Sequence, residues 1–416
     1  MQYLCSAPKL VIHGIFFLCC LLPLPAHAIM VHTVAELVNA VNATVSGGDK
    51  NILVGDGTYN LAGEYLRISV SGVTVSSASG DRDKVVLDGN YETTEIFQIV
   101  ASNTTIANMT LKRAYDHPVH IMSTSDHDVT DVQLLNLHIV DPGQQAVKIN
   151  PDSDRSHTIN NGIIRGCFIE LTDTGRDFVW KRNGSCYTGG IDAHLARAWR
   201  IEDNVIEGFW CSGSLSEHGI HFWSDSEDTL VQRNLILDCD RGIGFGLGSS
   251  GHLRGIIRNN MIWHGPDHGY SDVGIGLESA TAVQVYNNTI FHEHAYPNAI
   301  EYRFTASNDL IIANNLCNRE IVSRDGGTTT LLSHNMTTAP ASWFVAATNG
   351  NLHLNGPITG VVDAGLALSG LSDDFDRQPR PAGNGMDIGA DEYGSSPSTP
   401  TPPGKFTPAW QLLLLQ

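Results

Sequence analysis

The sequence predicts an all-β protein built as a parallel β-helix, and two observations support this fold. From about residue 100 onward a short phrase recurs, in which an apolar pair precedes Asn and alternating apolar residues follow it. Its anchors return every 26–38 residues, a spacing typical of solenoid repeats and too short for four-stranded propeller blades. These anchors are Asn108, Asn136, Gly166, Asn204, Asn234, Asn260, Asn288 and Asn315. The segments between them show no helical period, which favours short parallel strands over a helical array.

Asparagine suits these turns for two reasons. It tolerates the left-handed backbone conformation, and stacked Asn side chains form hydrogen-bonded ladders. Less regular rungs precede residue 100 in the phrases ILVGDGTY, LRISVSGVTVSS and KVVLDG. Further upstream, the amphipathic segment 33–44 is expected to form a helix that covers the open N-terminal end of the solenoid.

The chain divides into three predicted parts. Residues 1–28 combine Lys9, an apolar stretch and a small-x-small site ending at Ala28, which predicts a cleaved secretory signal. Residues 29–393 are expected to form the β-helix domain, with the regular rungs ending near Asn335. Residues 394–416 are typical of a Pro/Ser/Thr-rich linker followed by a short apolar tail. We therefore expect a protein that is secreted, periplasmic or at the cell surface, and monomeric.

Composition excludes several classes of function. The chain carries 25 Lys+Arg against 44 Asp+Glu, and its formal net charge of −19 argues against nucleic acid or anionic membranes as general partners. With 42% hydrophobic and 17% charged residues, the sequence is too apolar for a disordered chain. Beyond the predicted signal, no apolar stretch is long enough to span a membrane.

Five cysteines follow the predicted signal, and an odd number in an oxidising compartment allows at most two intrachain disulfides. We expect a bridge between Cys211 and Cys239, because both follow the Asn turn of adjacent rungs, and a buried free thiol at Cys317. No CxxC spacing indicates a structural zinc site. The sequence HEH at 292–294 is a weak metal signal without an assignable third ligand.

A second phrase precedes each Asn phrase, with the copies PVHIM, AVKIN, GIDAH, GIHFW, GIGFG, GIGLE and AIEYR. Side chains alternate along a strand, so the first and third positions after the small residue are expected to face inward. One predicted internal stack is then Val119, Val147, Ile191, Ile220, Ile243, Ile275 and Ile300.

Two outward columns run beside this stack, with consecutive members about 4.8 Å apart. The first column contains His120, Lys148, Asp192, His221, Gly244, Gly276 and Glu301. The second contains Met122, Asn150, His194, Trp223, Gly246, Glu278 and Arg303. Acidic, basic and aromatic side chains on adjacent rungs, exposed around a floor of glycines, predict a groove for a sugar chain. The alternative is that these side chains pair with one another beneath a covering loop.

The columns supply the candidate site residues. The candidate catalytic residues are His221, His194, Arg303, Lys148, Asp192, Glu278 and Glu301. The candidate substrate-binding residues are Trp223, Asn150, Gly244, Gly246 and Arg241. Trp223 is expected to stack on a pyranose ring, and the segments 173–190 and 263–270 are expected to form walls of the groove.

The cadence ILVGDGTYNL, ISVSGVTVSS, KVVLDG, followed by Asn-punctuated rungs, resembles the pectate-lyase-like superfamily of right-handed parallel β-helices. Its opening is most similar to the chondroitinase B and alginate lyase family. The closing DIGADEY at 387–393 resembles the end of many secreted bacterial β-helix repeat proteins. The lyase resemblance implies calcium held by carboxylates, a Lys base and a nearby Arg. The catalytic strand phrases of that family and the DPH signature of alginate epimerases are absent, so no calcium ligand or base carries over.

Three functions follow from these observations. A polysaccharide lyase would cleave an acidic, uronic-acid-containing polysaccharide by β-elimination, with the candidate bases above and possible Ca²⁺ as the only cofactor. A glycoside hydrolase would use the carboxylate pair Glu278 and Glu301. A non-catalytic surface protein would bind glycans without changing them. We expect the lyase ahead of the other two.

Overall fold

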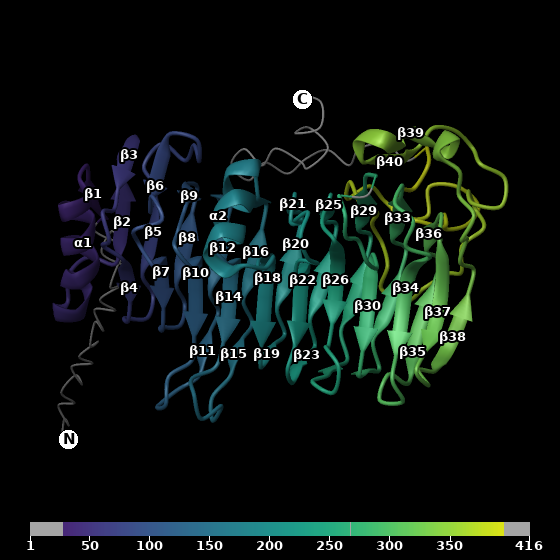
Figure 1. The fold of residues 1–416 in the computed structure, drawn as a ribbon, viewed down its shortest axis with the longest axis horizontal. Helices are drawn as coiled ribbons and strands as arrows, with labels where there is room; N and C mark the ends of the chain where they lie inside the picture. The colour runs from purple at the N-terminus through teal and green to yellow at the C-terminus, as the bar shows by residue number, and fades with distance from the viewer. Residues whose placement is uncertain (1–27, 267, 395–416) are drawn as a thin grey trace, which may run out of the picture.

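The structure is a computed structural model that describes residues 28–266 and 268–394. Apart from Ala28, the predicted signal lies outside the described residues, as do the linker and tail beyond Gly394. The described chain winds into an elongated solenoid with α1 (Val34–Ala43) at one end and a C-terminal segment folded over the other (Figure 1). The expected parallel β-helix is thereby confirmed. No helix among the described residues is both long enough and apolar enough to span a membrane.

Four parallel sheets, here named A to D, form the walls of the solenoid. Sheet A contains β1 (Ala28–Val31), β2 (Asn51–Val54), β5 (Thr74–Ser77), β8 (Thr105–Ala107), β12 (Gln133–Leu135), β16 (Ile163–Arg165), β20 (Arg200–Glu202), β24 (Leu230–Gln232), β28 (Ile256–Arg258), β32 (Gln284–Tyr286), β35 (Leu310–Ala313) and β38 (Thr329–Ser333). Sheet B contains β3 (Gly57–Asn60), β6 (Val85–Asp88), β9 (Thr110–Lys112), β13 (His138–Val140), β17 (Phe168–Glu170), β21 (Val205–Glu207), β25 (Leu235–Leu237), β29 (Met261–His264), β33 (Thr289–His292) and β36 (Leu316–Cys317).

Sheets C and D complete each turn. Sheet C contains β4 (Leu66–Ile68), β7 (Glu95–Ile99), β10 (His117–Met122), β14 (Gln145–Asn150), β18 (Gly189–His194), β22 (His218–Trp223), β26 (Arg241–Phe245), β30 (Ile275–Glu278), β34 (Asn298–Arg303) and β37 (Glu320–Arg324). Sheet D contains β11 (Val129–Thr130), β15 (Ile159–Asn160), β19 (Ala196–Arg197), β23 (Ser226–Glu227), β27 (His252–Leu253) and β31 (Ala280–Thr281). A middle rung such as β16, β17, β18 and β19 therefore contributes one strand to each sheet in order.

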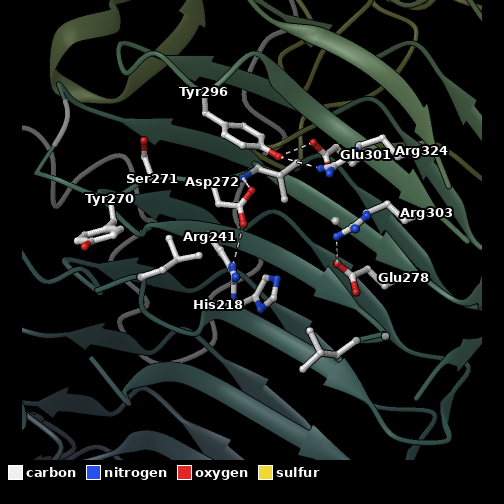
Figure 2. Close-up of a pocket in the computed structure, with 15 residues that line it drawn as sticks. His218, Arg241, Tyr270, Ser271, Asp272, Glu278, Tyr296, Glu301, Arg303 and Arg324 are labelled. Atoms are coloured by element: carbon white, nitrogen blue, oxygen red, sulfur yellow. Dashed lines mark hydrogen bonds and ion pairs between the residues drawn. The ribbon is translucent and has the colours of Figure 1, made fainter. Parts of the chain in front are cut away.

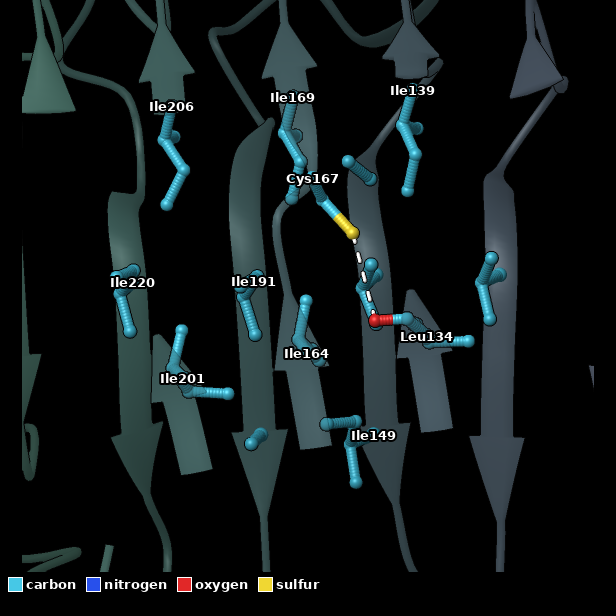
Figure 3. Close-up of a cluster of buried hydrophobic side chains, with 14 of the residues drawn as sticks. Leu134, Ile139, Ile149, Ile164, Cys167, Ile169, Ile191, Ile201, Ile206 and Ile220 are labelled. Atoms are coloured by element: carbon cyan, nitrogen blue, oxygen red, sulfur yellow. Dashed lines mark hydrogen bonds between the residues drawn. The ribbon is translucent and has the colours of Figure 1, made fainter. Parts of the chain in front are cut away.

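The core is a set of aliphatic rows that run along the solenoid axis. The predicted internal stack is confirmed, because Val119, Val147 and Ile191 are paired in register and fully buried, as are its later members. Rows from the other sheets face it across the interior, where isoleucines of successive rungs lie one above the other (Figure 3). Each fully buried Ile contributes roughly 1.5–3 kcal/mol to folding, so repetition along the axis stabilises a fold in which each rung packs chiefly on the rungs beside it.

The N-terminal cap forms as the sequence predicts. Thr33 accepts a hydrogen bond from the Glu36 backbone N–H, and the Glu36 side chain accepts one from the Thr33 backbone, which is a capping box. Leu37 and Val41 are buried beneath the helix. This apolar face covers the first rung, whose core would otherwise be open to water.

Asparagine ladders join the rungs at the corner between sheets A and B. Asn260 Nδ2 donates to Asn288 Oδ1 over 2.9 Å and also to the carbonyl of Val231 over 3.0 Å, and equivalent bonds run from Asn204 to Asn335. The predicted ladder is confirmed. The expectation that the ladder Asn itself takes the left-handed backbone conformation holds only in the first rungs. Asn108 and Asn136 have positive φ, whereas in later rungs the preceding residue takes the left-handed conformation and the ladder Asn does not. This frees the ladder side chain to point inward.

The C-terminal segment packs against the outer face of sheet B. It contains the short helices η2 (Ala341–Trp343) and η3 (Ala347–Asn349) and the antiparallel pair β39 (Phe344–Ala346) and β40 (Asn351–Leu354). Apolar residues of this segment form a second core with Leu237 and Phe291. The DIGADEY residues return to the solenoid, where the Ala390 N–H donates to Thr289 Oγ1 over 2.8 Å. The segment thus buries the apolar outer face of the last strands of sheet B.

Candidate functional site

The two predicted columns lie in register on the outer face of sheet C. Lys148 pairs with Asp192, Asp192 with His221, and His221 with Gly244 on consecutive strands. The second column is also in register, with Glu278 paired to Arg303. The alternation of inward and outward side chains along each strand therefore correctly predicts that these residues share one face of sheet C. Exposure differs from the expectation, because Asp192 is 6% exposed and His221 is 1% exposed.

The N-terminal half of the columns forms a buried polar cluster around Asp192. Lys148 makes an ion pair with Asp192, His194 Nε2 lies 3.2 Å from Oδ2, and Trp223 Nε1 donates to Oδ1 over 2.8 Å. Burial would raise the pKa of Asp192, but contacts from His194 and His221 and the Lys148 charge outweigh it and hold this pKa well below its usual value. The Asp192 carboxylate is thus bonded on both oxygens by neighbouring side chains.

Other predicted residues belong to the same buried cluster or its edge. His221 Nε2 donates to the Gly246 carbonyl over 3.2 Å, and its ring stacks on Trp223 at 5.3 Å. Asn150 Oδ1 is bonded to His120 Nε2 over 2.6 Å, one rung further toward the N-terminus. Across these rungs the side chains therefore pair with one another, which is the alternative to an open groove.

An open pocket of about 370 Å³ lies over the next rungs, at β26, β30 and β34. Five predicted residues line it: Arg241, Gly246, Glu278, Glu301 and Arg303. They are joined by residues that the sequence argument missed, namely His218, Asp272, Tyr296 and Arg324 (Figure 2). The column residues that line an open pocket are thus those of the C-terminal half.

Three arginines project into this pocket from β26, β34 and β37, and each contacts a carboxylate. Arg241 Nε lies 3.0 Å from Asp272, Arg303 Nη1 lies 3.0 Å from Glu278, and Arg324 Nη1 lies 2.7 Å from Glu301. Arg303 is used twice, since it also pairs with Asp325 at 2.9 Å.

Arg241 differs from the other two arginines. Its Nε is engaged, but no hydrogen bond or ion pair to a described residue involves its two Nη groups. Those groups are a planar pair of donors suited to a ligand carboxylate. Tyr296 stands opposite, where its hydroxyl donates to Glu301 over 2.5 Å and accepts from Arg324 over 3.2 Å. Burial and the adjacent Glu301 raise the pKa of Tyr296, so the phenol stays protonated.

The predicted glycine floor is partly occupied. A Cβ at Gly244 would stand 2.6 Å from His218 Nε2, so the missing side chain makes room for the imidazole, and Gly244 is not open to the pocket. Gly246 and Gly276 do line the pocket, and Gly246 has a φ of +80°. The glycines therefore position a histidine as well as leaving space.

His218 is a buried imidazole that lines this pocket. Burial, with the nearby charges of His221 and Arg241, holds its pKa well below the usual value, so the imidazole is neutral. Its Nδ1 atom is buried without a hydrogen-bond partner in the described part of the chain. Alternation counted back from Ile220 assigns His218 an inward position, and for this reason the sequence argument passed over it. At the first residue of β22 the chain is still turning from the preceding loop.

Two groups of side chains among the described residues bring possible metal ligands together. Glu217, His218 and His221 offer ligand atoms within 4.8 Å of one another, and a second group contains His353, Asp376 and Asp391. Each group contains imidazole, whereas calcium prefers six to eight oxygen ligands, so neither group fits the calcium implied by the lyase resemblance. The HEH histidines belong to neither group.

The insertion 173–190 contains α2 (Asp173–Asn183) but contributes no residue to the lining of the pocket, so its expected role as a groove wall stays a prediction. A disulfide joins Cys186 to Cys211, so the expected Cys211–Cys239 bridge is wrong. The inserted loop brings Cys186 beside Cys211, while Cys239 faces the core and is a buried thiol. The expectation for Cys317 is confirmed, since it is a buried free thiol.

Further contacts hold the insertion 173–190 against the neighbouring loops. Arg176 Nη1 donates to the Gly208 carbonyl over 2.7 Å, and its guanidinium lies 4.2 Å from the Trp210 ring centre. The other face of Trp210 stacks on His268 at 3.9 Å. Both predicted wall segments, 173–190 and 263–270, are thus connected through one loop.

Comparisons with known proteins agree with this architecture. The profile of a family described as "Periplasmic copper-binding protein (NosD)" matches residues 147–351, slightly less than half of the chain. Among solved structures, pectate lyase Pel9A is similar with a TM-score of 0.57 and 15% identity over 84% of this chain and 90% of that one. An alginate lyase from Paenibacillus sp. strain FPU-7 has a TM-score of 0.47 and 14% identity over 75% and 98%. No curated protein matches the sequence.

At 15% identity the pectate lyase establishes fold and nothing more. The chain is a right-handed parallel β-helix of the pectate-lyase type.

Proposed function

We propose that this protein is a polysaccharide lyase that cleaves an acidic polysaccharide containing uronic acid in the pocket over β26, β30 and β34. The observation that carries this proposal is the convergence of Arg241, neutral His218 and protonated Tyr296 in one pocket. β-Elimination requires these three roles: a cation for the carboxylate, a base for the C5 proton and an acid for the leaving oxygen.

The charges of the pocket suit one carboxylate better than a long run of them. Three arginines face four carboxylates in and beside the pocket: Asp272, Glu278, Glu301 and Asp325. The Nη groups of Arg241 are therefore the donors that a single uronate can engage without displacing an internal partner. The negative net charge of −19 requires such a local cation.

The reaction can be written with these residues alone. Arg241 binds the uronate carboxylate and stabilises the charge that develops when His218 takes the C5 proton. The electron pair of the C5–H bond forms the C4=C5 double bond, and the C4–O bond breaks. Tyr296 donates its proton to the leaving oxygen, and the phenolate is held by Arg324, 3.2 Å away. Solvent then returns the proton from His218 to Tyr296.

Substrate itself helps His218 act as a base. A uronate carboxylate beside the imidazole favours the imidazolium, so binding moves the pKa of His218 back toward neutrality. Efficient proton transfer requires a catalytic pKa near the working pH. No step in this scheme uses calcium, because the ligand groups described above do not suit that ion.

The remaining sequence candidates take supporting roles in this proposal. Glu278, Glu301 and Arg303 shape the pocket wall, while Asp192 and Lys148 anchor the adjacent cluster. Trp223, His194 and His221 support β22, which carries His218. Hydrolysis by Glu278 and Glu301 is less well supported, because both accept from arginines and a hydrolase needs one of its carboxyls protonated. We also propose export through residues 1–28 and action as a monomer.

Copper binding is a second candidate function, and Glu217, His218 and His221 carry it. His218 Nδ1 is buried without a hydrogen-bond partner among the described residues, His221 Nδ1 lies 3.4 Å from Asp192 Oδ1, and neutral imidazole is a good ligand for copper. The family whose profile matches residues 147–351 is described as copper-binding. A copper ion held by these side chains would place a fixed positive charge beside the imidazole that the lyase scheme uses as a base. Such a charge disfavours protonation of His218, so the two functions compete there.

The deciding experiment follows ultraviolet absorbance of metal-free protein mixed with polygalacturonate, alginate and chondroitin sulfate. Growing absorbance from the unsaturated product, abolished in His218→Ala and retained in His334→Ala, supports the lyase; His334 is an exposed histidine far from the pocket. New reducing ends without absorbance would indicate hydrolysis instead. Tight Cu²⁺ binding by calorimetry, lost in His218→Ala, with no product from any polymer, would favour the second candidate.

A further inference from the structure

We propose that Trp180, at the end of α2, is a stacking platform for a sugar, so that the ligand is a chain of several sugars reaching beyond the pocket. This inference rests on the function proposed above, since it takes an acidic polysaccharide as the ligand. It concerns the surface formed by α2 and the loops 208–217 and 268–274, here named the stapled wall.

The first observation is how the Trp180 ring is seated. An ideal Cβ on Gly213 would stand 2.1 Å from Cη2, 2.5 Å from Cζ3 and 2.6 Å from Cζ2 of Trp180. A point above the ring plane at Cη2 lies only slightly farther from Cζ2 and Cζ3 than from Cη2, as these distances do. A point in the ring plane beyond Cη2 would lie clearly farther from both flanking carbons. Gly213 therefore packs against one face of the indole.

The second observation is that the same side chain remains accessible. Trp180 is 41% exposed, although it is a large apolar residue. Because Gly213 covers one face, the accessible area belongs mainly to the opposite face and rim. A flat aromatic surface supported from behind is the shape that stacks on the apolar face of a pyranose.

The third observation connects Trp180 to the pocket. Gly213 stands two residues before Leu215, which lines the pocket. On the other side of this loop, a Cβ at Gly269 would lie 3.1 Å from the Ser212 carbonyl, and the next residue, Tyr270, lines the pocket and is 43% exposed. Trp180 and Tyr270 thus flank the same short loop, with the pocket beside it.

The platform is also rigid before any ligand arrives. The Cys186–Cys211 disulfide joins the loop after α2 to the loop that carries Gly213. Arg182, two residues after Trp180, pairs with Asp116 and lies 3.9 Å from the Tyr115 ring centre. Binding to a surface that is already ordered costs little conformational entropy, which is the advantage of preorganisation.

The test compares ligand length in the full protein. Calorimetry of the full protein carrying the inactivating His218→Ala substitution, with galacturonate and mannuronate oligomers of two and six units, should show tighter binding of the hexamer, which this variant does not cleave. Trp180→Ala should weaken hexamer binding about 5- to 10-fold, as expected for loss of one aromatic stack, and leave dimer binding unchanged. Trp180→Phe should restore most of the affinity. The matched control is Tyr65→Ala, an aromatic residue that is 51% exposed near the N-terminal end.

The outcomes separate the two proposals. If the dimer binds but the hexamer binds no better, or Trp180→Ala leaves the hexamer unchanged, the platform is refuted and the pocket proposal stands. If neither oligomer binds, the proposed function is refuted and the platform with it. Equal weakening of dimer and hexamer in Trp180→Ala would point to damage of the pocket and would also overturn the platform.

Discussion

Gly244→Ala is the substitution that best tests how the fold positions His218. The added Cβ would stand 2.6 Å from Nε2 and 2.7 Å from Cδ2 of His218. Non-bonded carbon atoms approach to about 3.5–4.0 Å, so the imidazole must move by about 1 Å. The backbone can stay in place, because Gly244 does not need a positive φ and the clash is with a side chain.

A displacement of about 1 Å at a reacting group costs about 100-fold in rate. We therefore expect kcat/KM on the uronate polymer to fall about 100-fold in Gly244→Ala, with most of the loss in kcat. The polymer should still bind, since Arg241 is unaffected. Initial rates of absorbance increase, measured over a range of polymer concentrations, give both constants.

The control is Gly356→Ala, since a Cβ at Gly356 meets no atom within 4 Å and its rate should equal that of the wild type. Thermal unfolding of both variants monitors the fold. Wild-type kcat/KM in Gly244→Ala, with the fold intact, would refute His218 as the base. A large loss of stability would instead refute the argument that only the imidazole moves.

Three further predictions concern the scaffold. Asn260→Ala leaves the Val231 carbonyl and the Asn234 N–H without their ladder partner, at about 1–3 kcal/mol each, so urea unfolding should show a loss of about 2–6 kcal/mol, whereas Asn384→Ala, at an exposed position, should change stability by less than about 0.5 kcal/mol. Burial raises the pKa of Asp374 to about 7, so the folded state binds this proton more tightly than the unfolded one; the Tm difference between wild type and Asp374→Asn should favour the wild type at pH 5 and disappear or reverse at pH 8. Non-reducing peptide mapping should find Cys186 linked to Cys211, which are 25 residues apart, and Cys186→Ser should lower stability by about 3 kcal/mol; a Cys211–Cys239 peptide would contradict the structure.

Repetition is what made so much of the fold predictable. The inward stack of Val119, Val147 and Ile191, the Asn ladder and the N-terminal helix all follow from local patterns, because strand alternation and capping act over a few residues. The pairing of Glu278 with Arg303 also follows, since rungs of similar length stack in register. The resemblance to pectate-lyase-like proteins gave the handedness, which the patterns alone did not.

Contacts that depend on irregular loops were not predictable in this way. The Cys186–Cys211 disulfide joins an insertion to a loop, and α2 lies in that insertion, so no repeat spacing relates the two cysteines. Tyr296 and Asp272 reach the pocket from the segments between strands. Burial of Asp192 and His221 results from mutual pairing, which a column of sequence letters does not reveal.

The amino-acid sequence by itself determined the solenoid, its core rows and the face of sheet C that carries the polar columns, because these depend on alternation and repeat length. Only the tertiary structure decided where along that face a ligand can enter. The side chains pair with one another around Lys148, Asp192 and His221, and the face opens over β30, where Gly276 carries no side chain beside His218. That choice depends on side-chain pairing across rungs and on loops folded from distant segments, which local periodicity does not encode.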